Sequence, residues 1–196
     1  MRLWMLVSED VYQKIVTAGE FHCEEKFILD RDFIPHYQWM VKQMDRRLIN
    51  HPKGLDYPLW AWCKQNGKHA KPDFRDPSNY YYDQTVCLEL EIPAEEVLLS
   101  DYDLWHFVLN NIYLSPIICT PHYEEYYTLQ EKCYDLQDNW FEALPREKQV
   151  AVKEKTWEYI FETPYSNDSH TYIQACFWSF KTEQIVKAWH YSKKKR

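Results

Sequence analysis

A short segment near the middle of the chain concentrates polar side chains that could act together. Asp101 and Asp103 stand at the start of a predicted helix, and His106 follows one turn later. Two carboxylates and an imidazole are groups that general acid–base catalysis uses, and they could also orient a substrate. The same side chains could simply stabilise the helix start, because Ser100 and the acidic residues accept from free backbone N–H groups and favour the helix dipole. The sequence leaves both interpretations open.

Two tryptophans and one arginine form a second candidate set. Trp60 and Trp62 are two residues apart in a segment that predicts a strand, so both indoles project from one face. Such a pair could stack on a planar ligand, such as a base or nicotinamide, or could only fill the core. Arg2, at the start of another predicted strand, could clamp a phosphate or carboxylate, or could form a surface ion pair.

Other kinds of site are excluded or disfavoured. The three glycines, Gly19, Gly54 and Gly67, are too far apart for a glycine-rich phosphate loop. The eight histidines form no H-x-H or H-E-x-x-H motif, and the nearest combination of metal ligands is Cys63 with His69, so we expect no metal. A G-x-S-x-G serine elbow is missing from the sequence, whereas a cysteine and a histidine that are distant in sequence could still meet.

Charge and hydropathy limit the expected partners. The net charge is −7, which disfavours duplex nucleic acid as a partner. The basic tail at residues 192–196, with its cluster Lys193–Arg196, is either a solvated end or a contact for phosphate. No run of about 18 apolar residues could span a membrane, and the opening residues do not resemble a signal peptide. The six cysteines form no C-x-x-C motif. We therefore expect a cytoplasmic protein in a reducing compartment, without a membrane partner.

The elements that must position these residues alternate between strands and helices. Short apolar or alternating runs predict strands at residues 2–7, 57–63, 85–92, 97–99, 171–180 and 185–191. Helical spacing predicts helices at residues 9–18, 33–48, 101–111, 120–136 and 145–161, with a long polar loop at 64–84. This order predicts an α+β fold: a single domain over residues 1–196, with helices inserted between small mixed or antiparallel sheets.

Capping residues set the expected ends of these helices. Ser8 is the predicted N-cap of the first helix and Gly19 its left-handed end. Asp32 is the predicted cap of the second helix, and Ser100 with Asp103 has capping-box spacing for the third. Helical spacing also predicts one apolar face on the second helix, formed by Phe33, Tyr37, Met40, Val41, Met44 and Leu48.

Three stretches together resemble one protein family. The first is Arg2–Trp4, which leads into a Ser-capped helix; the second runs from Trp39–Met44 to Pro58–Trp62; the third runs from Leu88–Pro93 through Val97–Asn110. They resemble the bacterial domain-of-unknown-function family 3841, and the resemblance covers nearly the whole chain. It implies shared ancestry and no particular reaction.

A fold-level likeness is to ADP-ribosyltransferase-type domains, which hold NAD between two small sheets without a glycine-rich loop. The likeness implies that Arg2 holds a phosphate and that Trp60 or Trp62 stacks on nicotinamide. On the late strand it implies an acid that stabilises the oxocarbenium-like transition state, where this chain has Gln174. A neutral amide stabilises positive charge far less than a carboxylate does, and Glu183 is the fallback.

Two functions follow as hypotheses. The first is an ADP-ribosyltransferase-like transferase, active or degenerate, that binds NAD or a nucleotide in an aromatic cleft. Its candidate catalytic residues are Gln174, His106 and Glu183, and its candidate binding residues are Arg2, Trp60, Trp62, Asp101 and Asp103. The second is a non-catalytic module whose aromatic surface binds a protein or a single-stranded nucleic acid, with the acidic balance favouring a protein.

Overall fold

The computed structural model describes residues 1–28, 31–114, 144–162 and 171–192. The predicted helix at 120–136 and the cluster Lys193–Arg196 lie outside these residues. The chain forms two compact units, one made of Met1–Leu99 with Asn167–Arg196 and the other of Ser100–Ser166. The prediction of a single domain stays a prediction.

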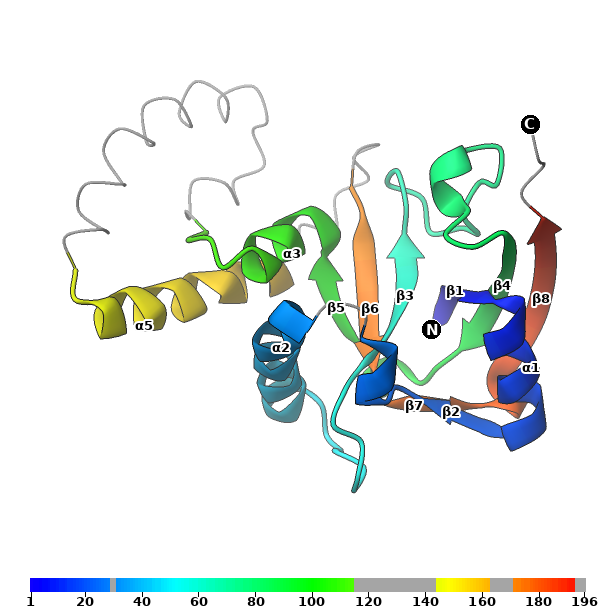
Figure 1. The fold of residues 1–196 in the computed structure, drawn as a ribbon, viewed down its shortest axis with the longest axis horizontal. Coiled ribbons are helices and arrows are strands. Elements are labelled where there is room, and N and C mark those ends of the chain that lie inside the picture. Colours follow the sequence, from blue (N-terminus) through cyan, green and yellow to red (C-terminus); the bar gives the residue numbers. More distant parts are fainter. Residues whose placement is uncertain (29–30, 115–143, 163–170, 193–196) are drawn as a thin grey trace. The chain divides into compact units, whose positions relative to one another are not determined.

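A six-stranded sheet dominates the first unit (Figure 1), in the order β5-β6-β3-β1-β4-β8. Its strands are β1 (Arg2–Ser8), β3 (Leu59–Lys64), β4 (Gln84–Glu91), β5 (Leu98–Asp101), β6 (Ile173–Phe177) and β8 (Ile185–Ser192). Antiparallel pairs join β1 to β3 and β4, β3 to β6, and β4 to β8. The α+β class with antiparallel pairing is therefore confirmed, and the first strand of the chain lies inside the sheet.

The helix after β1 begins and ends as predicted. In α1 (Glu9–Ala18), the Ser8 side chain accepts from the N–H of Val11 at 3.3 Å. Gly19 has a φ of 79°, a conformation that suits glycine because it has no Cβ, and its N–H donates to the carbonyl of Ile15 at 3.1 Å. The Ile15 side chain is fully buried, so α1 packs against the core.

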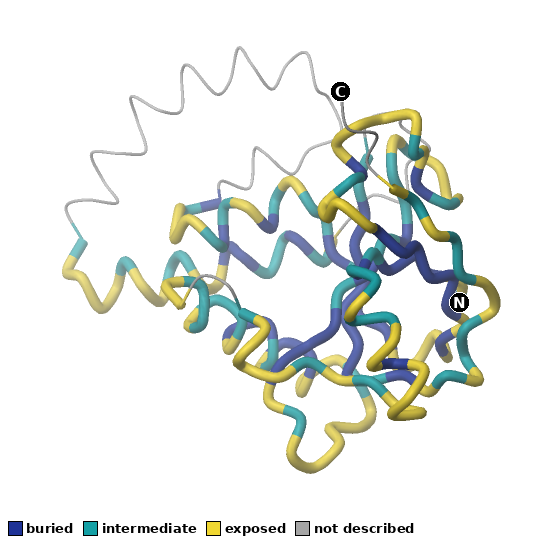
Figure 2. Tube along the Cα trace, turned by 45° about the vertical axis from the view of Figure 1, so that its right-hand side comes forward, coloured by how far each residue is buried: buried dark blue, intermediate teal, exposed yellow. Residues whose placement is uncertain are grey.

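The core lies on one face of the six-stranded sheet, where alternate residues of four strands meet. These residues are Leu3, Met5, Val7, Leu59, Ala61, Cys63, Val86, Leu88, Leu90, Ile173, Ala175 and Phe177. Figure 2 shows the central strands as buried. In β4, residues 85–90 are all buried, so both of its faces are covered rather than one.

The single strand predicted at 171–180 is two strands that belong to different sheets. The second sheet pairs β2 (Glu20–His22) with β7 (Ser179–Lys181). Trp178 lies between β6 and β7 and is buried, and Phe180 of β7 is 1% exposed in the same core as β6. A continuous apolar run does not reveal where a strand changes sheet when both sheets share one core, which is why the prediction was wrong.

The second helix begins later than predicted. Asp32 lies in the 3₁₀ turn η2 (Arg31–Phe33), and Phe33 takes the N-cap position of α2 (Ile34–Arg47) with no side-chain cap. The buried residues of α2 are Trp39, Met40, Gln43 and Met44. The buried stripe is therefore rotated from the predicted face, because it includes the indole of Trp39 and the whole side chain of Gln43, which the apolar pattern excluded.

The described part of the second unit is mainly helical. It contains α3 (Tyr102–Leu109), α5 (Arg146–Trp157) and the 3₁₀ turn η6 (Glu158–Phe161). The side chain of Asp101 accepts from the N–H of Leu104 at 2.9 Å and caps α3. The predicted cap, Ser100, lies in β5 and is fully buried, so the predicted capping box with Asp103 is wrong.

Contacts from α5 hold the segment that follows α3. The indole of Trp157 donates to the carbonyl of Ile112 at 2.7 Å, and the N–H of Leu114 donates to the hydroxyl of Thr156 at 3.3 Å. Four further 3₁₀ turns lie in the first unit: η1 (Glu25–Phe27), η3 (Pro77–Asn79), η4 (Ala94–Glu96) and η7 (Thr182–Gln184). Among the described helices, none is long and apolar enough to cross a lipid bilayer.

We expect Ser8→Ala to lower the free energy of unfolding by about 1 kcal/mol, because the first turn of α1 loses its side-chain acceptor. Urea denaturation measures the change. Ser8→Thr is the control, since it keeps a hydroxyl at this position. If Ser8→Ala and Ser8→Thr unfold at the same urea concentration as the wild type, the cap contributes nothing to stability.

Candidate functional site

The face of the six-stranded sheet that points away from the core brings candidate residues together. Strand register places one residue from each of five neighbouring strands in a line, which we call the cross-strand row. Its members, in order, are Gln174, Trp62, Trp4, Glu89 and Lys187. Directly opposed residues on adjacent strands have Cβ atoms about 5 Å apart, so their side chains can contact one another.

Two buried donors lie on either side of Trp62 in this row. Trp4 and Gln174 are each 6% exposed. Within the described part of the chain, neither the Nε1 of Trp4 nor the Nε2 of Gln174 has a hydrogen-bond partner. An unsatisfied buried donor costs about 1–3 kcal/mol, and native proteins satisfy nearly all of them. The two donors therefore mark a place beside Trp62 where an acceptor atom would be stabilising.

Arg2 lies next to the cross-strand row. Its Nη1 is 3.1 Å from Oε1 of Glu89, and its side chain is 59% exposed against 12% for Glu89. The backbone carbonyl of Arg2 accepts from Nε2 of His69 at 2.8 Å, and the imidazole meets the Trp4 ring edge-on at 5.1 Å. The ion pair, which is one of the two roles that the sequence left open for Arg2, is thus present. A guanidinium has five N–H donors, so one ion pair leaves capacity for an anion.

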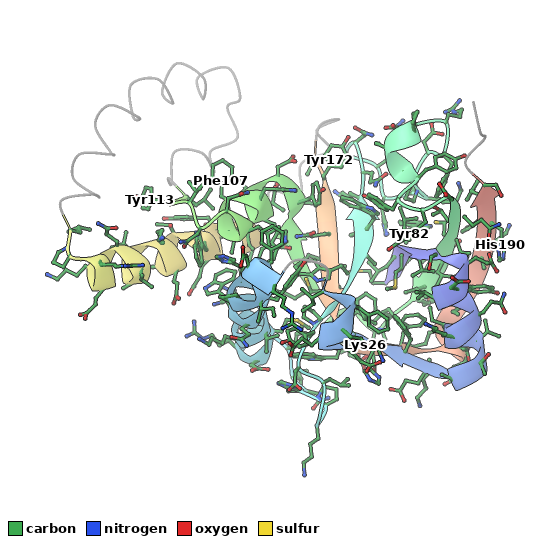
Figure 3. The ribbon with its side chains drawn as sticks, viewed as in Figure 1. Lys26, Tyr82, Phe107, Tyr113, Tyr172 and His190 are labelled. Carbon is green, nitrogen blue, oxygen red and sulfur yellow. The ribbon has the colours of Figure 1, made fainter. Side chains whose placement is uncertain are left out.

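Trp60 and Trp62 share a face of β3, as the strand period predicted. Both are half-buried. Trp62 meets Tyr172 edge-on with ring centroids 6.1 Å apart, and Trp60 meets Tyr37 of α2 at 6.0 Å. Figure 3 labels Tyr172, which lies at the beginning of β6. Each indole is therefore held by a neighbouring ring.

Every member of the cross-strand row except Lys187 lies within the residues that one sequence family matches. The family described as domain of unknown function DUF3841 matches residues 2–186. The chain belongs to the DUF3841 family. A search of curated proteins and a search of solved structures each found no match. In this DUF3841 chain, Trp4, Trp62 and Glu89 come one each from the three stretches that carry the family resemblance, and the fold places them side by side.

The acidic and histidine candidates of the second unit have the contacts of a capped helix start. Burial raises the pKa of Asp101 more than its hydrogen bond from Leu104 lowers it, and burial also raises the pKa of Asp103. His106 is exposed, and its Nδ1 donates to the carbonyl of Tyr102 at 2.9 Å. These contacts match the capping interpretation that the sequence left open.

Of the three residues predicted for catalysis, Gln174 is the one in the cross-strand row. Glu183 is exposed in η7, where the N–H of Thr182 donates to the carbonyl of Gly19 at 2.9 Å. Glu183 comes before β8 in the chain, and the residue of β8 that stands in the row is Lys187. Glu183 therefore lies outside the row, and His106 belongs to the second unit.

Sequence reasoning did not include Trp4 or Glu89 among the candidate residues, and it considered His69 only as a metal ligand beside Cys63. A carboxylate in the middle of a strand with apolar neighbours was a usable signal, because Glu is seldom buried without a partner. Glu89 is 9% exposed, and its partner Arg2 is distant in sequence. Only the register between β1 and β4 shows that the two residues meet, and neither strand contains that information alone.

The described cysteines are all free thiols whose pKa values are raised, chiefly by burial. They are Cys23, Cys63, Cys87 and Cys176. The pKa of Cys23 is about 11 and that of Cys87 about 12. A thiol protonated at neutral pH is a weak nucleophile and a poor metal ligand. Among the described residues, no three His, Cys, Asp or Glu side chains are grouped for a metal ion.

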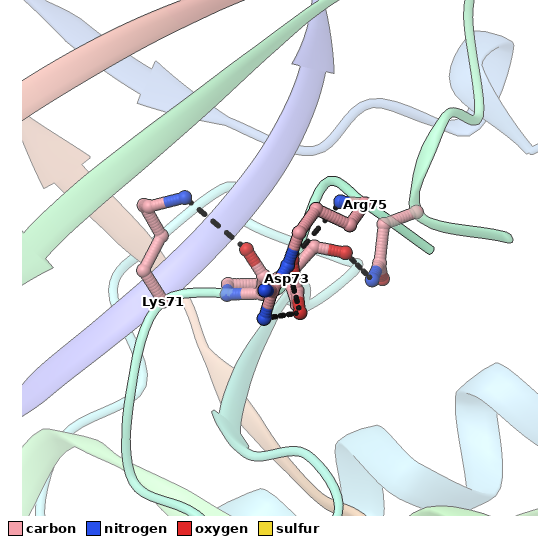
Figure 4. Close-up of polar contacts among 5 residues, drawn as sticks. Lys71, Asp73 and Arg75 are labelled. Carbon is pink, nitrogen blue, oxygen red and sulfur yellow. Dashed lines mark hydrogen bonds and ion pairs between the residues drawn. The ribbon is translucent and has the colours of Figure 1, made fainter. Parts of the chain in front are cut away.

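Lys71, in the polar loop between β3 and β4, contacts aromatic residues of β8. The Nζ of Lys71 lies 5.0 Å from the ring centroid of Phe74, 5.1 Å from that of Tyr191 and 5.4 Å from that of Trp189. It also donates to the Tyr191 hydroxyl at 2.8 Å and to the Pro72 carbonyl at 3.2 Å. We call this arrangement the Lys71 cage. Figure 4 shows Lys71 in this loop, near the ion pair of Asp73 and Arg75.

A cavity of about 350 Å³ lies at the beginning of β3. It is lined by Cys23, Phe27, Ile28, Phe33, Tyr37, Tyr57, Pro58 and Trp60. The hydroxyl of Tyr57 donates to Oε2 of Glu25 at 3.3 Å. Five of the eight lining side chains are aromatic, so the cavity walls are mostly ring surfaces.

His51 is clamped beside the buried Trp178. The two rings stack with centroids 4.1 Å apart, while Nδ1 of His51 lies 2.5 Å from Oδ1 of Asp45 and Nε2 lies 2.8 Å from the carbonyl of Leu55. Both partners are acceptors, so the imidazolium, which donates from both nitrogens, fits this site. Burial acts to lower the pKa of His51, but the hydrogen bonds to Leu55 and Asp45 outweigh it and raise the pKa.

We expect His51 in the folded protein to titrate above its ordinary value of about 6.5, as followed by NMR of its ring. Because the folded pKa is raised, the clamp stabilises fully below the unfolded pKa, and this stabilisation is lost as the pH rises through the folded pKa. Asp45→Asn should lower the pKa of His51 and flatten the pH dependence of unfolding. Asp56→Asn, which removes a nearby charge without a hydrogen bond to His51, is the matched control. Equal pKa values in Asp45→Asn and the wild type would contradict the clamp.

Proposed function

We propose that this DUF3841 chain binds a nucleotide-type ligand, with NAD as the candidate, on the face that bears the cross-strand row. The observation that carries the proposal is the pair of unpartnered donors beside Trp62, the Nε1 of Trp4 and the Nε2 of Gln174. Nucleobases and the carboxamide of nicotinamide combine a flat ring with an acceptor oxygen or nitrogen. Such a group can stack on an indole while it accepts from the neighbouring donors.

Two cations near Glu89 support the phosphate part of the proposal. Arg2 contacts Glu89 directly, and Lys187 stands opposite Glu89 on β8. Both side chains are exposed, so a phosphate could approach them without being buried. Glu91 stands opposite Arg2 in the strand register and brings a second carboxylate, so the phosphate contact depends on the N–H donors of Arg2 that the ion pair with Glu89 leaves unused.

The transfer chemistry needs a carboxylate, and we propose Glu89 for that role. In this step nicotinamide leaves as a neutral molecule, and water or a nucleophile of a target protein forms the new bond to the ribose carbon. Positive charge develops on the ribose as the old bond breaks, and a nearby carboxylate stabilises that charge. Gln174 is neutral, so we assign it to binding. Glu89 is the one carboxylate of the cross-strand row, and its side chain is 12% exposed.

We expect calorimetric titration with NAD to show saturable binding, and Gln174→Leu to weaken it about tenfold because one hydrogen bond is lost. The same variant should unfold at an equal or higher urea concentration than the wild type, because it removes an unpartnered buried donor. Tyr82→Leu, which changes an exposed aromatic residue outside the row, is the control and should bind as the wild type does.

A nicotinamide-release assay separates binding from transfer. Release that is lost in Glu89→Gln supports the transferase, whereas binding without release identifies a degenerate, non-catalytic module. Absence of any binding heat at millimolar NAD, AMP and ADP would overturn the proposal.

A further inference from the structure

The aromatic cavity at the beginning of β3 is a separate feature from the cross-strand row, and the proposed nucleotide site does not use it. We propose that this cavity binds an organic cation whose positive nitrogen carries methyl groups, as in a quaternary ammonium. The argument rests on three observations: the ring surfaces that line the cavity, the charge of the groups around it, and the Lys71 cage elsewhere in the same unit.

Ring surfaces give the cavity its electrostatic character. Aromatic faces carry partial negative charge and attract a cation within about 6 Å of the ring centroid, and tryptophan does so most strongly. Trp60 forms part of the wall, and the Tyr37 ring meets it edge-on at 6.0 Å. None of the eight lining side chains is ionised at neutral pH, since burial raises the pKa of the one thiol, Cys23, to about 11.

The charged groups beside the cavity favour a cation over an anion. Glu25 accepts from the hydroxyl of the lining residue Tyr57 at 3.3 Å, which places a carboxylate next to the wall. The nearby ammonium of Lys26 is paired with Glu24 at 2.6 Å and lies 5.2 Å from the ring centroid of Phe27. The charge of Lys26 is therefore already balanced by Glu24, and Glu25 adds a second negative charge beside the cavity.

The Lys71 cage shows that this protein holds ammonium groups with the same kinds of ring. Nζ of Lys71 lies 5.0–5.4 Å from the ring centroids of Phe74, Trp189 and Tyr191, beside the stacked pair that Phe74 and Tyr191 form with centroids 3.7 Å apart. That primary ammonium also donates to an oxygen of Tyr191 and to one of Pro72, which replace part of its hydration. The cavity offers the rings but few acceptors. A primary ammonium would lose hydration there without replacement, whereas a quaternary nitrogen has no N–H group to satisfy.

The test compares choline with 3,3-dimethyl-1-butanol, its uncharged carbon isostere. Saturation-transfer NMR of the methyl signals, followed by titration, should show saturable choline binding that is at least about tenfold tighter than that of the isostere, the size expected of a cation–π contribution. Trp60→Leu should abolish choline binding. Trp62→Leu, two residues along the same face of β3 but outside the cavity, is the matched control and should leave it unchanged.

Glu25→Gln provides a surface variant that keeps the wall intact in case Trp60→Leu fails to fold. It should weaken choline binding several-fold and leave binding of the isostere unchanged. Equal affinity for choline and the isostere would show a merely apolar cavity and overturn the proposal, as would no detectable choline binding or binding that neither variant reduces. Gln174→Leu, which tests the nucleotide site, should not affect choline, so the two proposals fail independently.

Discussion

The antiparallel register of β1 between β3 and β4 is the constraint on which the rest of the structure depends. Trp4 stands opposite Trp62 on one side and opposite Glu89 on the other. Because side chains alternate, this register also sends Leu3 and Met5 into the core. A slip of one residue would exchange the two faces, so that the polar row would point into the apolar core and the core residues would point to the opposite face. Core packing and site geometry are therefore set by the same hydrogen bonds.

Placing polar groups on central strands has an energetic cost. β4 is buried on both faces, yet it carries Glu89, and β6 carries Gln174 with an unpartnered amide nitrogen. An apolar side chain at either position would bury more easily. Glu89 recovers part of the cost through Arg2, whereas Gln174 and Trp4 do not within the described residues. Polar groups that lower stability in this way are typical of sites where a protein meets a ligand.

Local signals predicted the parts of the fold that local physics decides. Ser8 and Gly19 set the ends of α1 because an acceptor before the helix and a left-handed residue after it suffice. Where two neighbours could serve equally, the sequence could not choose: Asp101, the last residue of β5, caps α3, whereas Ser100 is fully buried within that strand. Contacts between distant strands, such as Arg2 with Glu89, follow from register, which no single segment encodes.

The high aromatic content acquires a physical role once the contacts are known. Ring contacts add to backbone and side-chain acceptors around positive charge: Lys71 lies near three rings, Lys187 lies 5.0 Å from the centroid of Trp189, and His51 stacks on Trp178. A chain with three glycines has few positions where the backbone can approach a charged ligand closely. Rings overcome that limit because their faces attract cations at distances that do not require close backbone approach. The composition that excludes a glycine-rich loop for binding a charged ligand therefore supplies aromatic rings that can contact a cation.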